Sequence, residues 1–246
     1  LEHMLFKGTP TTGPEEYSRI IAKNGGRSNA FTTSDMTVYF ATMSREKIHI
    51  QLDLEADRMA NALLGDTYFE PEKKVIQEER RLRTDDNPGS ALYEMAASVA
   101  YTLHPYRRPV VGWMEDIQSL TRQDLVDFYK LYYAPNNAVI VMVGDFKSDE
   151  MLAKIKAAYG KITRGLEPPK LTLVEPSQRG EKRVTLKKEA ELPILMLFHH
   201  APNLHSPDSF ALDLLSIVLA GGKSSRGRPR SRHACAACSM VCSTFS

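Results

Sequence analysis

The cysteines of this chain, Cys235, Cys238 and Cys242, all lie within its last twelve residues. The 234 residues before them contain none, so no disulfide framework can hold the body of the chain together. The body must therefore be stabilised by burial of its apolar residues, which make up 42% of the 246-residue sequence. That length is enough for one large domain or for two modest ones.

Charge and hydropathy exclude several partners. The formal net charge is +2, too small to indicate nucleic acid or an anionic membrane as a partner. The longest apolar run, around residues 138–143, has the length of a strand and is too short to span a bilayer. The sequence starts without an initiator Met and shows no signal peptide. We therefore expect no nucleic-acid partner and no membrane span, while the compartment stays open: bacterial periplasm, bacterial cytoplasm or mitochondrion.

Helical and strand-like patterns alternate along the chain. Apolar spacing and capping residues predict helices near residues 14–24, 44–64, 70–85, 90–101, 121–132, 148–159 and 206–220. Thr121 followed by Asp124 resembles a capping box. Stretches rich in β-branched and aromatic residues predict extended structure at 29–43 and strands at 138–143, 182–188 and 194–200.

A proline- and glycine-rich stretch divides the sequence. Residues 164–180 hold three prolines and two glycines and predict a linker between a domain at 1–163 and a second unit at 181–226. From residue 227 the apolar period stops, which suggests a frameshifted or artificially appended tail at 227–246. The alternative is a metal site built from the tail's Cys-x-x-Cys-x-x-x-Cys spacing and His233.

A glutamate falls on the apolar face of the helix predicted at 70–85. Val75, Ile76 and Leu82 define that face, and Glu79 lies three or four residues from each of them. Glu72, seven residues earlier, is on the same side of the helix. A carboxylate in an apolar face is costly unless it is paired, protonated or bound to a metal. The simpler interpretation is a buried ion pair with an Arg or Lys.

The first residues of the chain match part of a zinc motif. In the arrangement His-x-x-Glu-His on a helix, two imidazoles bind zinc from one face and the carboxylate acts as a general base. Leu1-Glu2-His3 matches its last three positions, with the first His expected two places before Leu1. Taken alone, a Glu-His pair is more commonly found on an exposed turn.

Together with later segments, these residues resemble the pitrilysin and insulinase family of zinc peptidases, which includes the mitochondrial processing peptidase and bacterial relatives. Residues 1–9 are similar to that family's site helix and the turn after it, and residues 25–39 to its substrate-binding edge strand. Residues 75–79 resemble the downstream helix that donates the third zinc ligand. Later similar segments lie at 104–112, 132–137, 143–146 and 219–226, so the resemblance covers residues 1–226.

The resemblance implies a fold and a set of roles. The fold is α+β: a mostly antiparallel sheet packed by helices, followed by the start of a second homologous domain. The site would hold one zinc ion, and Glu72 would support it without necessarily touching the metal. The other implied roles are general base for Glu2, zinc ligands for His3 and Glu79, and pairing with an extended peptide for Asn29, Ala30 and Thr32. The alternative for residues 29–32 is an ordinary covered edge.

The implied function is a zinc-dependent endopeptidase that hydrolyses peptide bonds in extended peptides through a metal-activated water. The first zinc ligand and the substrate-anchoring Arg and Tyr of the second domain are missing from residues 1–226. We therefore expect a fragment truncated at both ends, with weak zinc binding and no activity alone. The alternative is a non-catalytic, peptide-binding subunit of the same family. A homodimer or a heterodimer is open for the full-length protein.

Overall fold

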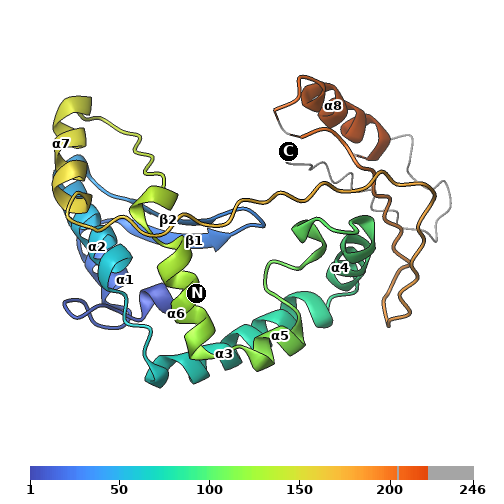
Figure 1. Cartoon of the computed structure of the whole chain (residues 1–246), viewed down its shortest axis with the longest axis horizontal. Coiled ribbons are helices and arrows are strands. Elements are labelled where there is room, and N and C mark those ends of the chain that lie inside the picture. Colours follow the sequence, from blue (N-terminus) through green and yellow to red (C-terminus); the bar gives the residue numbers. More distant parts are fainter. Residues whose placement is uncertain (204, 221–246) are drawn as a thin grey trace. The chain divides into compact units, whose positions relative to one another are not determined.

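The computed structural model describes residues 1–203 and 205–220 (Figure 1). The chain divides into two compact units. The first consists of Leu1–Gln77 and Gly112–Leu171, and the second of Glu78–Val111 and the chain from Thr172 onward. The predicted tail at 227–246 and its cysteine motif lie outside the described residues.

The first unit packs helices against a β-hairpin around an apolar core. Its core is formed by Met4, Leu5, Leu64, Phe69 and Leu125, which are all buried. Its elements are η1 (His3–Phe6), α1 (Glu16–Lys23), β1 (Arg27–Thr32), β2 (Thr37–Thr42), η2 (Arg45–Lys47), α2 (Ile48–Asn61), most of α3 (Asp66–Arg80), α5 (Met114–Ser119), α6 (Arg122–Tyr132), η5 (Pro135–Asn137) and α7 (Ser148–Tyr159).

The hairpin consists of two antiparallel strands, β1 and β2 (Figure 1). Ala30 is paired with Tyr39 and Thr32 with Thr37. A turn joins the strands, in which the Thr33 N–H donates to the Met36 carbonyl at 2.8 Å. The stretch predicted as extended, 29–43, is therefore extended but folded back on itself.

The second unit is built around α4 (Pro88–Ala100). Before it lie the end of α3 and the π-helical turn η3 (Arg81–Asp85); after it lie η4 (Pro105–Arg107) and α8 (Asp208–Ala220). Arg80 is buried and its two terminal nitrogens each lie 2.8 Å from an oxygen of Glu94. The Asn87 side chain caps α4 by accepting the Ser90 N–H at 3.0 Å. These paired and capped polar groups connect the elements of this unit.

Chain segments far apart in sequence meet at the end of α4. The Glu175 carboxylate accepts the N–H groups of Thr102, Leu103 and His104 at 2.5, 2.8 and 2.8 Å. Lys182 donates to the Val99 carbonyl at 2.8 Å, and the His200 ring to the Ala100 carbonyl at 2.9 Å. Cationic and polar donors at the carboxyl end of a helix satisfy carbonyls that have no partner within it.

The structure confirms the α+β class and the predicted helices, including the capping box of Thr121 and Asp124. The strands predicted at 138–143, 182–188 and 194–200 are wrong, because β1 and β2 are the only strands within the described ranges. Val139, Val141 and Val143 are 88, 79 and 95% exposed. A stretch rich in β-branched and aromatic residues makes a strand only where a neighbouring strand takes up the backbone hydrogen bonds, and within residues 1–203 and 205–220 no strand pairs with these segments. Within residues 1–203 and 205–220, no helix is both long and apolar enough to cross a membrane.

Candidate metal and catalytic site

The short helix η1 holds the two residues of the partial zinc motif in place. Met4 and Leu5 are both 3% exposed and anchor η1 in the core, so the preceding Glu2 and His3 are left at the rim of the unit. Gly8 then turns the chain with φ +106°, and a Cβ there would lie 2.5 Å from the Thr12 carbonyl oxygen. Only glycine fits this turn without strain. The orientation of Glu2 and His3 is thus set by buried neighbours and by one glycine.

Glu72 of α3 reaches the site from 69 residues away. One oxygen lies 2.8 Å from His3 Nδ1 and the other 2.9 Å from Lys7 Nζ. Burial raises the pKa of Glu72, but hydrogen bonds from Lys7 and His3 outweigh it, so the pKa lies below its usual value. An ionised carboxylate only accepts, so His3 Nδ1 donates to it. Carboxylates orient the imidazoles of metal sites in this way, with the other ring nitrogen used for the metal.

Glu2 is linked to the hairpin. The Thr32 hydroxyl donates to a Glu2 carboxylate oxygen and lies 3.1 Å from the Thr37 hydroxyl. On the same strand, the Ala30 N–H donates to the Asn29 side-chain oxygen at 2.9 Å. The structure therefore brings Glu2, His3, Glu72 and Thr32 together in one unit, and Thr32 lies on β1, the strand that also carries Asn29 and Ala30.

Glu79 lies near the end of α3 and belongs to the second unit. Its side chain is 24% exposed and lies 2.7 Å from Arg83, one helical turn further on. The prediction of a buried apolar face around it is wrong, because Val75 is 49% and Leu82 69% exposed. Helical spacing shows which side chains share a face, but packing partners decide whether that face is buried. The ion pair of the simpler interpretation is present, between Glu79 and Arg83, but it is not buried as predicted, because the Arg83 side chain is 79% exposed.

The side chains proposed as ligands are of types that bind zinc, but among the described residues the structure does not bring together the three protein ligands of a catalytic zinc site. Zinc binds imidazole and carboxylate groups, which His3 and Glu79 provide. In the described part of the chain, no group of three or more His, Cys, Asp or Glu side chains is placed to hold a metal ion. Glu72 contributes to the site through His3 and Lys7.

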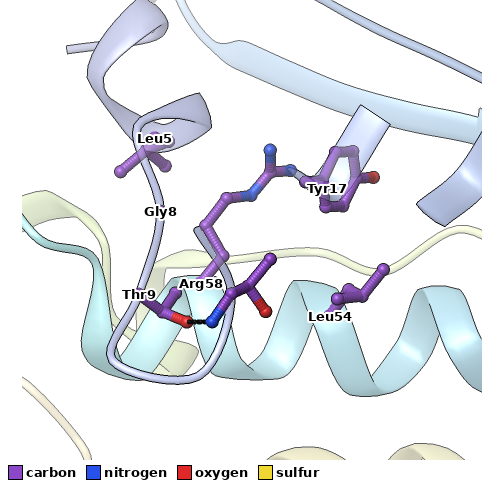
Figure 2. Close-up of a pocket in the computed structure, with 7 residues that line it drawn as sticks. Leu5, Gly8, Thr9, Tyr17, Leu54 and Arg58 are labelled. Atoms are coloured by element: carbon purple, nitrogen blue, oxygen red, sulfur yellow. Dashed lines mark hydrogen bonds between the residues drawn. The ribbon is translucent and has the colours of Figure 1, made fainter. Parts of the chain in front are cut away.

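Two residues near the site were not predicted. Lys7 lies four residues after His3, a helical spacing that could have pointed to a shared partner. Arg58 of α2 is buried with a side chain 3% exposed, and it lines a small pocket with Leu5, Gly8, Thr9, Thr12, Tyr17 and Leu54 (Figure 2). Nothing in the position of Arg58 along α2 indicates from the sequence that its side chain is buried or lines a pocket.

Two models of one peptidase family match this chain. Residues 1–112 match the family model described as Insulinase (Peptidase family M16), and residues 119–232 match Peptidase M16 inactive domain. The chain belongs to peptidase family M16. This confirms the resemblance drawn from the motifs, because the first of these models is described by the name insulinase.

Two similar curated proteins of this family are bacterial. A Helicobacter pylori protein named zinc protease PqqE is 36% identical over 228 residues, and a Mycobacterium leprae protein named as an uncharacterized zinc protease is 34% identical over 230 residues. Each alignment covers 92% of this chain and 51% of the relative, so the chain spans about half the length of these proteins.

Solved structures of the same family share the fold. A crystal structure of a protease from Helicobacter pylori has a TM-score of 0.78 at 32% identity and covers 91% of this chain and 55% of that one. A Peptidase M16 inactive domain from Pseudomonas fluorescens has a TM-score of 0.71 at 19% identity, with 91% and 54% covered, which shows the fold alone.

Proposed function

We propose that this chain carries catalytic residues of a zinc-dependent endopeptidase that cleaves extended peptides. The observation that carries the proposal is the contact of Glu72 with His3 Nδ1 beside the contact of Thr32 with Glu2. It places an oriented imidazole and a carboxylate on adjacent residues at the rim of the first unit. A ligand and a base at adjacent positions are what metal-assisted hydrolysis requires.

Each residue has a role in this reaction. His3 and Glu79 would be ligands of one zinc ion, and Glu72 would keep the His3 ring oriented. Zinc, when bound, supplies a Lewis acid and lowers the pKa of an attacking water to about 7. Glu2 would be the group that accepts a proton from the attacking water and returns it to the leaving amine. The Thr32 hydroxyl, which donates to Glu2, holds the carboxylate on the side of the substrate strand.

The substrate strand is β1. Asn29, Ala30 and Thr32 lie on it, and β2 pairs with β1 along one edge. An extended peptide that added to the other edge would be recognised through its backbone, with broad tolerance of its side chains. The Asn29 side chain, which accepts the Ala30 N–H, would be displaced by a substrate carbonyl at that position.

For the chain as a whole, we propose a zinc domain at 1–163, a linker at 164–180 and the start of a second homologous domain at 181–226. Because the described residues gather fewer than three metal donors, we expect the 246-residue chain to bind zinc weakly and to have no peptidase activity by itself. The bacterial relatives favour a bacterial periplasm or cytoplasm as the place of action.

The experiment is a zinc titration of the chain by competition with a chromogenic chelator. His3→Ala and Glu79→Gln should each weaken zinc binding at least about tenfold, whereas Glu2→Gln should leave it nearly unchanged. Matched controls are His49→Ala, an exposed histidine of α2, and Glu78→Gln, the exposed neighbour of Glu79. Equal zinc affinity of the wild type, His3→Ala and His49→Ala would contradict the ligand assignment.

The second candidate is a non-catalytic subunit that binds peptides. It is favoured by the match of residues 119–232 to the inactive domain of the family. This function requires peptide binding without zinc. Fluorescence anisotropy of a labelled, unfolded peptide, measured with and without a chelator, separates the two: binding that is unaffected by the chelator and by Glu2→Gln, with no cleavage, supports the subunit. Zinc-dependent cleavage supports the enzyme.

A further inference from the structure

A buried arginine lies beneath the site. Arg58 is on α2, its side chain is 3% exposed, and its guanidinium carbon lies 5.0, 4.4 and 4.3 Å from the ring centres of Phe6, Tyr17 and Tyr39. Figure 2 shows the guanidinium reaching the ring of Tyr17. A desolvated cation near aromatic faces is a stronger contact than an exposed one. Arg58 is therefore the centre of an aromatic cluster.

The three rings come from three elements. Phe6 is the last residue of η1, the helix that begins at His3. Tyr17 belongs to α1, and Tyr39 to β2, where it is paired directly with Ala30 of the proposed substrate strand. The rings also touch one another, because Phe6 lies 5.8 Å from Tyr17 and 6.0 Å from Tyr39, centre to centre. Arg58 thus contacts both the helix of the proposed ligand and the strand next to the proposed substrate edge.

The hydrogen-bond donors of Arg58 are only partly satisfied. Nη2 lies 2.5 Å from a Glu55 oxygen, and the other Glu55 oxygen accepts the Tyr17 hydroxyl at 2.5 Å. Nη1 is buried without a hydrogen-bond partner among the residues that the structure describes. A buried ion pair with an unsatisfied donor adds little stability compared with apolar packing. A role in fixing the geometry of neighbours accounts better for a guanidinium at this position than a contribution to stability does.

We propose that Arg58 is a positioning residue of the site, which orients η1, with Glu2 and His3, against the β1–β2 hairpin through its contacts with Phe6, Tyr17 and Tyr39. The consequence for the site is direct. Thr32 reaches Glu2 only if η1 and the hairpin keep their relative placement. The planar guanidinium lies near three rings at once, which a lysine ammonium cannot do equally well. The inference rests on the proposed function for the roles of Glu2 and His3.

The test compares Arg58→Lys with the double variant Arg58→Met/Glu55→Gln, which removes both charges and keeps the side-chain volumes close. The exposed Arg19→Met of α1 is the control. Amide hydrogen exchange is followed at Leu5, whose N–H donates to the carbonyls of Leu1 and Glu2, and at Lys7, whose N–H donates to the Met4 carbonyl. Helix α6 serves as the reference. Zinc affinity of each variant is measured in parallel. Near-ultraviolet circular dichroism reports the tyrosine cluster.

We expect both Arg58 changes to speed exchange at Leu5 and Lys7 by about thirtyfold, the scale of one desolvated cation–π contact, while α6 exchanges as in the wild type. The zinc affinity of both variants should fall by a similar factor. Wild-type exchange in both variants overturns the inference, as does uniformly faster exchange across the first unit, which would mean a general stabilising role. If the wild type binds no zinc, the proposed ligand roles fail, while the exchange data still decide whether Arg58 orients η1.

Discussion

Glu175 offers a prediction whose size follows from the structure. Its carboxylate accepts three successive backbone N–H groups, from Thr102, Leu103 and His104, at 2.5 to 2.8 Å. Partial burial raises the pKa of Glu175, but these three hydrogen bonds outweigh burial and lower it from 4.5 to about 2. A shift of that size corresponds to roughly 3 kcal/mol for a fully buried group. Because this carboxylate is near the surface, solvent reduces the contribution to roughly 1–2 kcal/mol.

The perturbation is Glu175→Gln, which keeps the shape and removes the charge. Since the pKa is lowered on folding, the stabilisation is present above pH 4.5 and is lost as the pH falls from 4.5 toward 2. At pH 7 the amides of Thr102, Leu103 and His104 should exchange with solvent about 5- to 30-fold faster in the variant, because about 1.4 kcal/mol corresponds to tenfold. Wild-type protection of the same amides should decline between pH 4.5 and 3.

The control is Glu181→Gln, on the same stretch of chain, where the glutamate pairs with Arg183 at an exposed position. Its effect on the exchange of residues 102–104 should be negligible. The reasoning is refuted if Glu175→Gln leaves the three amides as protected as in the wild type, or if Glu181→Gln exposes them to the same degree.

Two further predictions concern local backbone chemistry, each checked by urea denaturation. Thr121→Ala removes the capping box of α6 and should cost about 1 kcal/mol, whereas Ser44→Ala should cost close to nothing, because the Ser44 side chain makes no capping hydrogen bond. Gly8→Ala should cost roughly 1–3 kcal/mol, because φ is +106° and the added methyl would meet the Thr12 carbonyl at 2.5 Å. Gly65→Ala, with nothing within 4 Å of the added carbon, should be near neutral; equal losses for Gly8 and Gly65 would contradict the argument.

Local signals in the sequence were sufficient to predict the helices and to recognise the family. The capping box at Thr121 depends on residues three apart, so it could be read without the fold and is confirmed. The same holds for the partial motif at Glu2 and His3, whose chemistry lies in adjacent positions and whose family assignment the comparisons confirm. Their catalytic roles stay predictions.

Contacts between distant segments were decided only by the tertiary structure. Residues 138–143 form an apolar run of strand length, but whether they pair depends on a neighbour elsewhere in the chain, and no strand within residues 1–203 and 205–220 pairs with them. Val75 and Leu82 lie three or four residues from Glu79, the spacing from which a buried face was predicted, yet both side chains are exposed in the structure.

The candidate site shows the same division. The sequence by itself determined that Glu2 and His3 stand side by side at the start of a helical turn. Only the tertiary structure placed Glu72, 69 residues away, on His3, and Arg58 among the rings of three separate elements. The physical reason is range: helical spacing and capping act over three or four residues, whereas a buried ion pair or an aromatic cluster exists only once distant segments have packed together.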